Sequence, residues 1–135
     1  MTQNLSGLWK ANLEKSKLLG PTPKSMAAKI DYLDPDLSVE MKIAMPDESQ
    51  HNLVFKGPTT GAEVFNIVNG QKWQSRMRWI GTELLIESWV DVGDRKYHFR
   101  DFWFLSNDGQ LLTMEHRNDD LQGQITVLEK VSAEG

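Results

Sequence analysis

The sequence contains no cysteine, and this absence excludes both disulfide bonds and thiolate metal sites. It also lacks a block of basic residues: its 15 basic and 19 acidic residues are interspersed, and the formal net charge is −4. Without such a block the chain could not neutralise a run of phosphates, so we predict that nucleic acid is not a partner. Neither a secretory signal nor an apolar run of the roughly 20 residues needed to cross a bilayer is visible. These absences predict a cytoplasmic protein without a membrane span.

Helical periodicity is missing as well, and from residue 25 onward apolar and polar side chains alternate in short segments. Turn residues separate the segments about every 8 to 12 positions, and the strongest hairpin signals are Asn-Gly at 69–70 and Asn-Asp-Gly at 107–109. We therefore predict ten strands, over residues 5–13, 26–33, 37–45, 51–56, 62–69, 72–80, 83–91, 96–105, 110–117 and 123–131.

Ten short antiparallel strands expose two sheet edges unless the sheet closes, and closure of a meander gives an up-and-down β-barrel. The length of 135 residues matches one domain, so we predict an all-β protein with a single barrel domain over residues 1–135. A β-sandwich is the alternative. Segment 14–26 contains Gly20, Pro21 and Pro23, which oppose a long helix or a central strand, and we expect it to cross one end of the barrel.

The opening stretch "SGLWK", residues 6–10, resembles the Gly-x-Trp element in the first strand of the calycin superfamily, which includes lipocalins and fatty-acid-binding proteins. The longer stretch "LSGLWKANLEKSK" is also similar to the start of small uncharacterised lipocalin-like domains of soil bacteria. The resemblance implies that Trp9 closes the narrow end of a barrel and that Gly7 lets the backbone bend there. It also implies that a cation from a late strand covers Trp9, a role that either Arg117 or Lys130 could fill.

Alternation allows each strand to be phased by its apolar members, and the clearest case is 72–80, where Lys72, Gln74, Arg76 and Arg78 form a polar face. The opposite face carries large polarizable side chains, which suit either a packed core or a cavity for a flat apolar ligand. The predicted ligand-binding wall comprises Tyr32, Met41, Phe55, Trp73, Ser75, Met77, Trp79, Tyr97, Phe99, Trp103 and Glu115. Phasing of two later strands places these further side chains inward: Leu85, Glu87, Trp89, Leu111, Thr113 and Arg117.

Polar residues on the predicted inner face are few, and we take His51 and Asp101 as candidate catalytic residues. A histidine beside a carboxylate in an apolar cavity could act as a general acid and base. Because a buried carboxylate needs a partner, an ion pair of Arg117 with Asp101 or Glu115 is the purely structural interpretation.

Three function classes are open. The first is binding of a small, mostly hydrophobic molecule inside the barrel, with no cofactor and no metal ion. The second is a cofactor-independent enzyme, of isomerase, cyclase, dehydratase or hydrolase type, that uses acid and base residues of the same cavity. The third is a fully packed barrel that acts through its surface. His51, His98 and His116 lie on separate strands without zinc-ligand spacing, although one histidine would suffice to bind haem. We expect a monomer or a homodimer.

Overall fold

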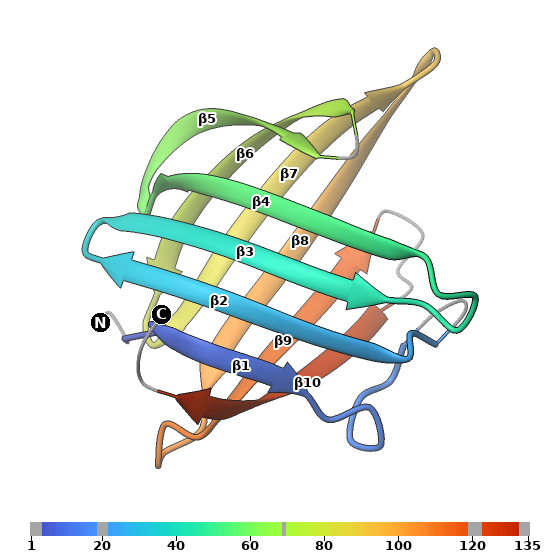
Figure 1. Ribbon diagram of the computed structural model, residues 1–135. Coiled ribbons are helices and arrows are strands. Elements are labelled where there is room, and N and C mark those ends of the chain that lie inside the picture. The colour runs from blue at the N-terminus through green and yellow to red at the C-terminus, as the bar shows by residue number, and fades with distance from the viewer. Residues whose placement is uncertain (1–3, 19–21, 69, 119–122, 133–135) are drawn as a thin grey trace.

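Ten antiparallel strands form one sheet that curls into a nearly closed barrel (Figure 1). The computed structural model describes residues 4–18, 22–68, 70–118 and 123–132. The strands are β1 (Gly7–Ala11), β2 (Ser25–Leu33), β3 (Asp36–Ala44), β4 (Gln50–Pro58), β5 (Thr60–Val68), β6 (Gln71–Ile80), β7 (Glu83–Val92), β8 (Arg95–Leu105), β9 (Leu111–Asn118) and β10 (Gly123–Ser132). The prediction of an antiparallel all-β barrel with ten strands is confirmed. Within the described ranges, no helix long and apolar enough to span a membrane is found.

The strand order is β4-β3-β2-β1-β10-β9-β8-β7-β6-β5, which is a simple meander rolled so that β1 and β10 lie side by side. Consecutive strands are hydrogen-bonded to one another, with one exception: β4 and β5 stand at the two ends of the order. A single sheet of this kind is a barrel with one seam, and the sandwich alternative is wrong. We call the gap between β4 and β5 the seam.

The first strand is shorter than the predicted 5–13, and its register with β10 shifts between Leu8 and Trp9. Gly7 adopts a φ of 149°, a backbone conformation that residues with a Cβ rarely adopt. Glycine is therefore the residue suited to the backbone at position 7. After β1 the chain follows β10, where Lys17 forms an isolated bridge with Ile125 and the hydroxyl of Ser16 accepts a hydrogen bond from the Val127 amide. The predicted crossing of 14–26 over one end includes residues 19–21, which lie outside the described residues.

One end of the barrel is packed around Trp9, whose side chain is only 1% exposed. Its indole Nε1–H donates to the carbonyl oxygen of Leu5 at 3.1 Å. The surrounding core is contributed by almost every strand and contains Leu5, Ile30, Leu37, Val39, Met77, Leu84, Leu112 and Leu128, each nearly or fully buried. Trp9 thus closes this end as a core residue.

The cation over Trp9 is Lys130, whose Nζ lies 5.6 Å from the centre of the indole ring. Lys130 is placed there by the pairing of β1 with β10, in which it is the partner of Trp9. Arg117 does not occupy this position, because it lies on the outer surface with its guanidinium 5.8 Å from the ring centre of Phe102. The structural role that we considered for Arg117 is therefore filled by Lys130.

Candidate functional site

The other end of the barrel holds an interior cavity of about 360 Å³. The position of a residue along its strand determines whether its inward side chain packs in the core or lines the cavity. On β3, Val39 belongs to the packed core, whereas Met41 and Ile43 line the cavity. The apolar wall consists of Met26, Met41, Ile43, Leu53, Phe55, Val68, Trp73, Ile86, Trp103 and Met114. The polar lining consists of Asn66, Ser75, Ser88, Asp101, His116, Gln124 and Thr126. The interior thus has a packed core at one end and a cavity at the other.

Two polar pairs in the wall arise from strand register. Asp101 and His116 are partners in the pairing of β8 with β9, and His116 Nδ1 lies 2.7 Å from Asp101 Oδ1. The hydrogen bond to Asp101 raises the pKa of His116 above its ordinary value, and burial offsets only part of this effect. Ser75 and Ser88 are partners in the pairing of β6 with β7, and their hydroxyl oxygens lie 2.9 Å apart. In each pair, one hydrogen bond joins the two side chains.

Trp73, a residue of the cavity wall, carries a buried donor without a partner. Its indole Nε1–H is buried and has no hydrogen-bond acceptor, and it is the only buried side-chain nitrogen or oxygen in this state among the described residues. The ring stacks on Phe99, with centres 5.3 Å apart, and Phe99 in turn lies 5.1 Å from the His116 ring. This aromatic stack fixes the indole in the wall.

The side chain of Asn66 bridges the seam. Its Oδ1 accepts a hydrogen bond from the Lys56 amide at 3.0 Å, and its Nδ2 donates to the Lys56 carbonyl oxygen at 3.1 Å. A side-chain carboxamide thereby takes the place of a backbone partner that β5 does not supply to β4. Because Asn66 also lines the cavity, the seam is part of the cavity wall.

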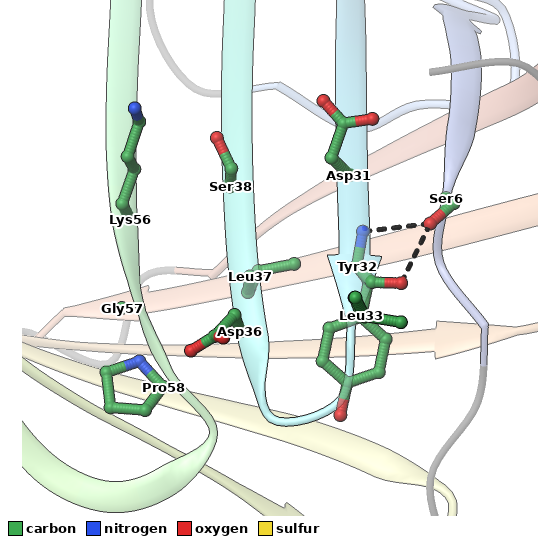
Figure 2. Close-up of a pocket in the computed structure, with 10 residues that line it drawn as sticks. All are labelled: Ser6, Asp31, Tyr32, Leu33, Asp36, Leu37, Ser38, Lys56, Gly57 and Pro58. Atoms are coloured by element: carbon green, nitrogen blue, oxygen red, sulfur yellow. Dashed lines mark hydrogen bonds between the residues drawn. The ribbon is translucent and has the colours of Figure 1, made fainter.

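A second hollow, of about 590 Å³, lies near the turn between β2 and β3 (Figure 2). It includes Asp31, Ser38 and Lys56, which are register neighbours with polar side chains on three adjacent strands. Figure 2 also shows the Ser6 hydroxyl, which donates to the Tyr32 carbonyl and accepts from the Tyr32 amide. This hollow is more open to solvent than the interior cavity, so the interior cavity is the better candidate for a ligand site.

Several predicted wall residues do line the cavity. They are Met41, Phe55, Trp73, Ser75 and Trp103, and the predicted catalytic residue Asp101 lines it too. The inward phase of 72–80, on which these assignments depend, agrees with the structure, since Ser75 and Met77 are buried while Arg76 and Arg78 are exposed. Tyr97 and Phe99 are stacked on each other with centres 6.4 Å apart, next to the wall rather than in its lining.

Tyr32, Met77 and Trp79 point inward but belong to the packed end of the barrel. Trp79 Nε1–H donates to the Tyr32 hydroxyl at 3.0 Å, and the same hydroxyl lies 3.1 Å from Thr59 Oγ1 and bonds to Asp34. Burial and the neighbouring Asp34 carboxylate raise the pKa of Tyr32. This network joins the β2–β3 turn to β6, and none of these three residues lines the cavity.

The placement of His51 corrects the predicted catalytic couple. His51 shares a face with Leu53 and Phe55, but it stands at the beginning of β4, is exposed and is not part of the cavity lining. The histidine beside Asp101 is His116 instead. Alternation fixes the face of a side chain but not its depth, and His51 is beyond the edge of the cavity.

Glu115 and Arg117 are on the outer face of β9, opposite to the prediction. Both faces of this strand contain apolar residues, and the buried positions are Leu112 and Met114 rather than Leu111 and Thr113. Glu115 and Arg117 form the ion pair that we considered, but they form it in the hydrated outer layer, where charges need less compensation. Glu115 is therefore not a cavity residue.

The phase of β7 is also opposite to the prediction, because Ile86, Ser88 and Val90 point inward. Glu87 lies outside, where its Oε2 is 3.3 Å from His98 Nε2 and 3.8 Å from Arg100 Nε. Leu85 and Trp89, the other two β7 residues predicted to point inward, are on the outer face as well. Leu85 is nevertheless buried, and Trp89 stacks on His98 with ring centres 4.9 Å apart.

The most important cavity residue that we did not assign to the site is His116. The alternative phase of β9, with Leu112, Met114 and His116 together, would have indicated it. Asn66 and Gln124 carry no sequence signal for an inward role, because each is a polar residue within an alternating strand. In the described part of the chain, no three histidine or carboxylate side chains lie close enough to hold a metal ion.

Comparison with solved structures places this architecture among known barrels. The chain superposes on human cRBP IV with a TM-score of 0.67 and 14% identity, covering 96% of this chain and 99% of that protein. The superposition on secretory abundant heat soluble protein 4 of Ramazzottius varieornatus has a TM-score of 0.68 and 11% identity. It covers 97% of this chain and 98% of that protein. The superposition on the zebrafish ileal bile acid-binding protein, in complex with cholic acid, has a TM-score of 0.62 and 14% identity. It covers 96% of this chain and 100% of that protein.

The chain has a calycin-like fold. No protein-family model and no curated protein matches the sequence, so the likeness is one of fold. The calycin-like barrel agrees with the resemblance carried by Gly7 and Trp9, since both residues stand at the packed end as that resemblance implies.

Proposed function

We propose that the protein binds a small, mostly hydrophobic molecule in the interior cavity. The observation that carries this proposal is the interior cavity of about 360 Å³, which is bounded mainly by Met, Trp, Phe and aliphatic side chains. Pockets of this size and lining are typical of small-molecule sites. The similar zebrafish protein is in complex with cholic acid, which supports a small-molecule ligand for a barrel of this fold.

The cavity also supports binding over a barrel that acts only through its surface. A fully packed barrel would leave no such volume. The cofactor-independent enzyme is the alternative. His51 is exposed and outside the lining, but Asp101 is hydrogen-bonded to His116 in the wall, and this pair is a histidine–carboxylate couple of the kind that the enzyme would need. We keep binding as the proposal because the lining is mainly apolar.

The test uses N-phenyl-1-naphthylamine, a neutral apolar probe whose fluorescence rises in apolar surroundings. We expect saturable binding and a higher melting temperature, because a ligand that binds only the folded state stabilises it by about 2.7 kcal/mol at roughly 100 times its Kd. Quenching of the indole fluorescence should accompany binding, since Trp73 and Trp103 line the cavity.

A matched pair of variants locates the probe. Ile43→Trp places a larger side chain in the cavity, whereas Val54→Trp places the same side chain on the next strand at an exposed position. We expect Ile43→Trp to abolish probe binding and Val54→Trp to retain it. Equal binding by both folded variants would show that the probe does not occupy the cavity.

A further inference from the structure

Four residues that are opposite one another on neighbouring strands form a row across the cavity wall. Asp101 on β8 is opposite Ile86 on β7 and opposite His116 on β9. His116 is in turn opposite Gln124 on β10. Directly opposite residues project from the same face of a sheet, and all four residues of this row line the cavity. Asp101 and His116, in the middle of the row, therefore face the cavity.

Each side chain of the Asp101–His116 pair keeps one polar atom that the pair does not use. The bond between Asp101 Oδ1 and His116 Nδ1 is the only hydrogen bond that either side chain makes with the described residues. Neither Asp101 Oδ2 nor His116 Nε2 is among the buried atoms without a partner. Both atoms therefore keep accessible surface, in side chains that are 24% exposed for Asp101 and 33% exposed for His116. A ligand in the cavity can reach them.

The pair lies next to apolar side chains. Trp103 and Met114, two positions away on the same strands, are opposite each other and belong to the core cluster. The ring of Phe99 lies 5.1 Å from the ring of His116, measured between centres. In surroundings of low polarity a hydrogen bond is stronger than in water. A ligand that forms a hydrogen bond with this pair would therefore gain more than it would at the surface.

The hydrogen-bonding properties of the pair define what a ligand must bring. A carboxylate accepts and does not donate, so a ligand group at Asp101 Oδ2 must be a donor. For the same reason the proton of the imidazole is on Nδ1, where it is donated to Asp101 Oδ1. His116 Nε2 then accepts when the imidazole is neutral and donates when it is protonated. A hydroxyl group both donates and accepts, so it matches the pair in either state.

We propose that the cavity selects hydrophobic molecules that carry an alcohol or phenol hydroxyl, and that this hydroxyl donates a hydrogen bond to Asp101 Oδ2. The inference rests on the proposed function and names the ligand class. His116 is a positioning residue, because it holds the other oxygen of the same carboxylate. The apolar part of the ligand contacts the apolar wall, where Phe55 meets Trp103 edge to face with ring centres 5.8 Å apart.

The test compares three naphthalenes of similar size by calorimetry at pH 8: 2-naphthol, 2-methoxynaphthalene and 2-ethylnaphthalene. The first brings a donor and an acceptor, the second an acceptor alone, and the third neither. We expect 2-naphthol to bind about tenfold more tightly than the other two, because a buried hydrogen bond to a charged acceptor is worth at least about that factor. Binding of 2-methoxynaphthalene as tight as that of 2-naphthol would overturn the requirement for a donor.

Variants of Asp101 assign the acceptor. Asp101→Leu removes it, and the preference for 2-naphthol should fall to about twofold or less. Asp101→Asn keeps a neutral acceptor, and the preference should fall to about threefold, since hydrogen bonds to a charged acceptor are roughly twice as strong. Asp91→Leu is the matched control, because Asp91 is an exposed carboxylate outside the cavity lining and its loss should leave the preference unchanged. An undiminished preference in either folded variant of Asp101 would overturn the assignment.

The outcomes also separate this inference from the proposed function. If none of the three naphthalenes binds and N-phenyl-1-naphthylamine does not bind either, the proposed function itself fails. If 2-ethylnaphthalene binds and Ile43→Trp blocks it, but 2-naphthol binds no more tightly, the cavity binds ligands and the role of Asp101 is wrong.

Discussion

His116 Nδ1 lies 2.7 Å from Asp101 Oδ1, between two residues that stand directly opposite each other on β8 and β9. The pair lines the cavity, and the hydrogen bond to Asp101 raises the pKa of His116 in the folded protein. A raised folded pKa means that the protonated histidine binds its proton more tightly in the folded than in the unfolded chain. The resulting stabilisation is fully present below the unfolded pKa of about 6.5 and is lost as pH rises through the folded value.

We expect Asp101→Asn to remove this pH-dependent contribution. The difference in unfolding free energy between the wild type and the variant should be larger at pH 5.5 than at pH 9, because the hydrogen bond to Asp101 favours protonated His116 and protonation decreases as pH rises. Urea unfolding at the two pH values measures the difference. His98, which faces Glu87 on the outer surface, provides the control: in His98→Gln the effect of Asp101→Asn should persist. A difference that grows with pH would contradict the assignment.

The Asn66 bridge predicts a local change at the seam. Asn66→Ala removes both hydrogen bonds to the Lys56 backbone, and we expect a loss of about 1 kcal/mol, because water can replace them at this exposed strand. The exchange of the Lys56 amide proton should become faster, as NMR-detected hydrogen exchange would show.

Asn66→Asp is the matched control, because a carboxylate can still accept from the Lys56 amide but cannot donate to its carbonyl oxygen. We expect Asn66→Asp to preserve slow exchange at the Lys56 amide even though it destabilises the protein. Fast exchange in both variants would show that the Lys56 amide is not protected by this side chain.

The sequence predicts the barrel and most strand phases because alternation is unambiguous where one face is uniformly polar. On β6, Arg76 and Arg78 leave only one choice for Trp73 and Ser75. On β7 and β9 both faces carry apolar residues, so phase depends on which set meets the core, as Leu112 and Met114 do. The alternation within one strand does not show which of two apolar faces packs against the core.

Strand alternation also does not predict how far along the barrel axis an inward side chain lies. Trp73 and Trp79 share a face of β6, yet Trp73 lines the cavity and Trp79 packs against Tyr32 at the closed end. The pairing of Asp101 with His116 likewise depends on the register between β8 and β9. Register and depth come from long-range packing, which a single strand does not encode.

Gly57 is required by a close approach inside the barrel. A Cβ at this position would lie 2.6 Å from Met77 Cε and 2.9 Å from Val64 Cγ2. Gly57→Ala should therefore destabilise the protein by about 1–3 kcal/mol through overpacking. Urea unfolding measures the change, and Gly123→Ala serves as the control, because its nearest atom beyond chain neighbours is 3.8 Å away.

The stiff partner in this contact is Val64, since the end of Met77 can rotate away. In a double-mutant cycle, Gly57→Ala should cost less in a Val64→Ala background than in the wild type. Strictly additive effects would mean that Val64 does not restrict position 57.

Trp9 belongs to the packed core and not to the cavity lining, and mutation can test this assignment. Trp9→Ala should cost about 3–5 kcal/mol, because it leaves a void among fully buried neighbours such as Ile30 and Leu128. Leu8→Ala is the control on the same strand, and since Leu8 is 38% exposed we expect a much smaller loss. Trp9 does not line the cavity, so the Trp9→Ala protein that remains folded should bind N-phenyl-1-naphthylamine with nearly unchanged affinity. Unchanged stability would show that Trp9 is not a core residue, and loss of probe binding from the folded variant would show that the two ends of the barrel are coupled.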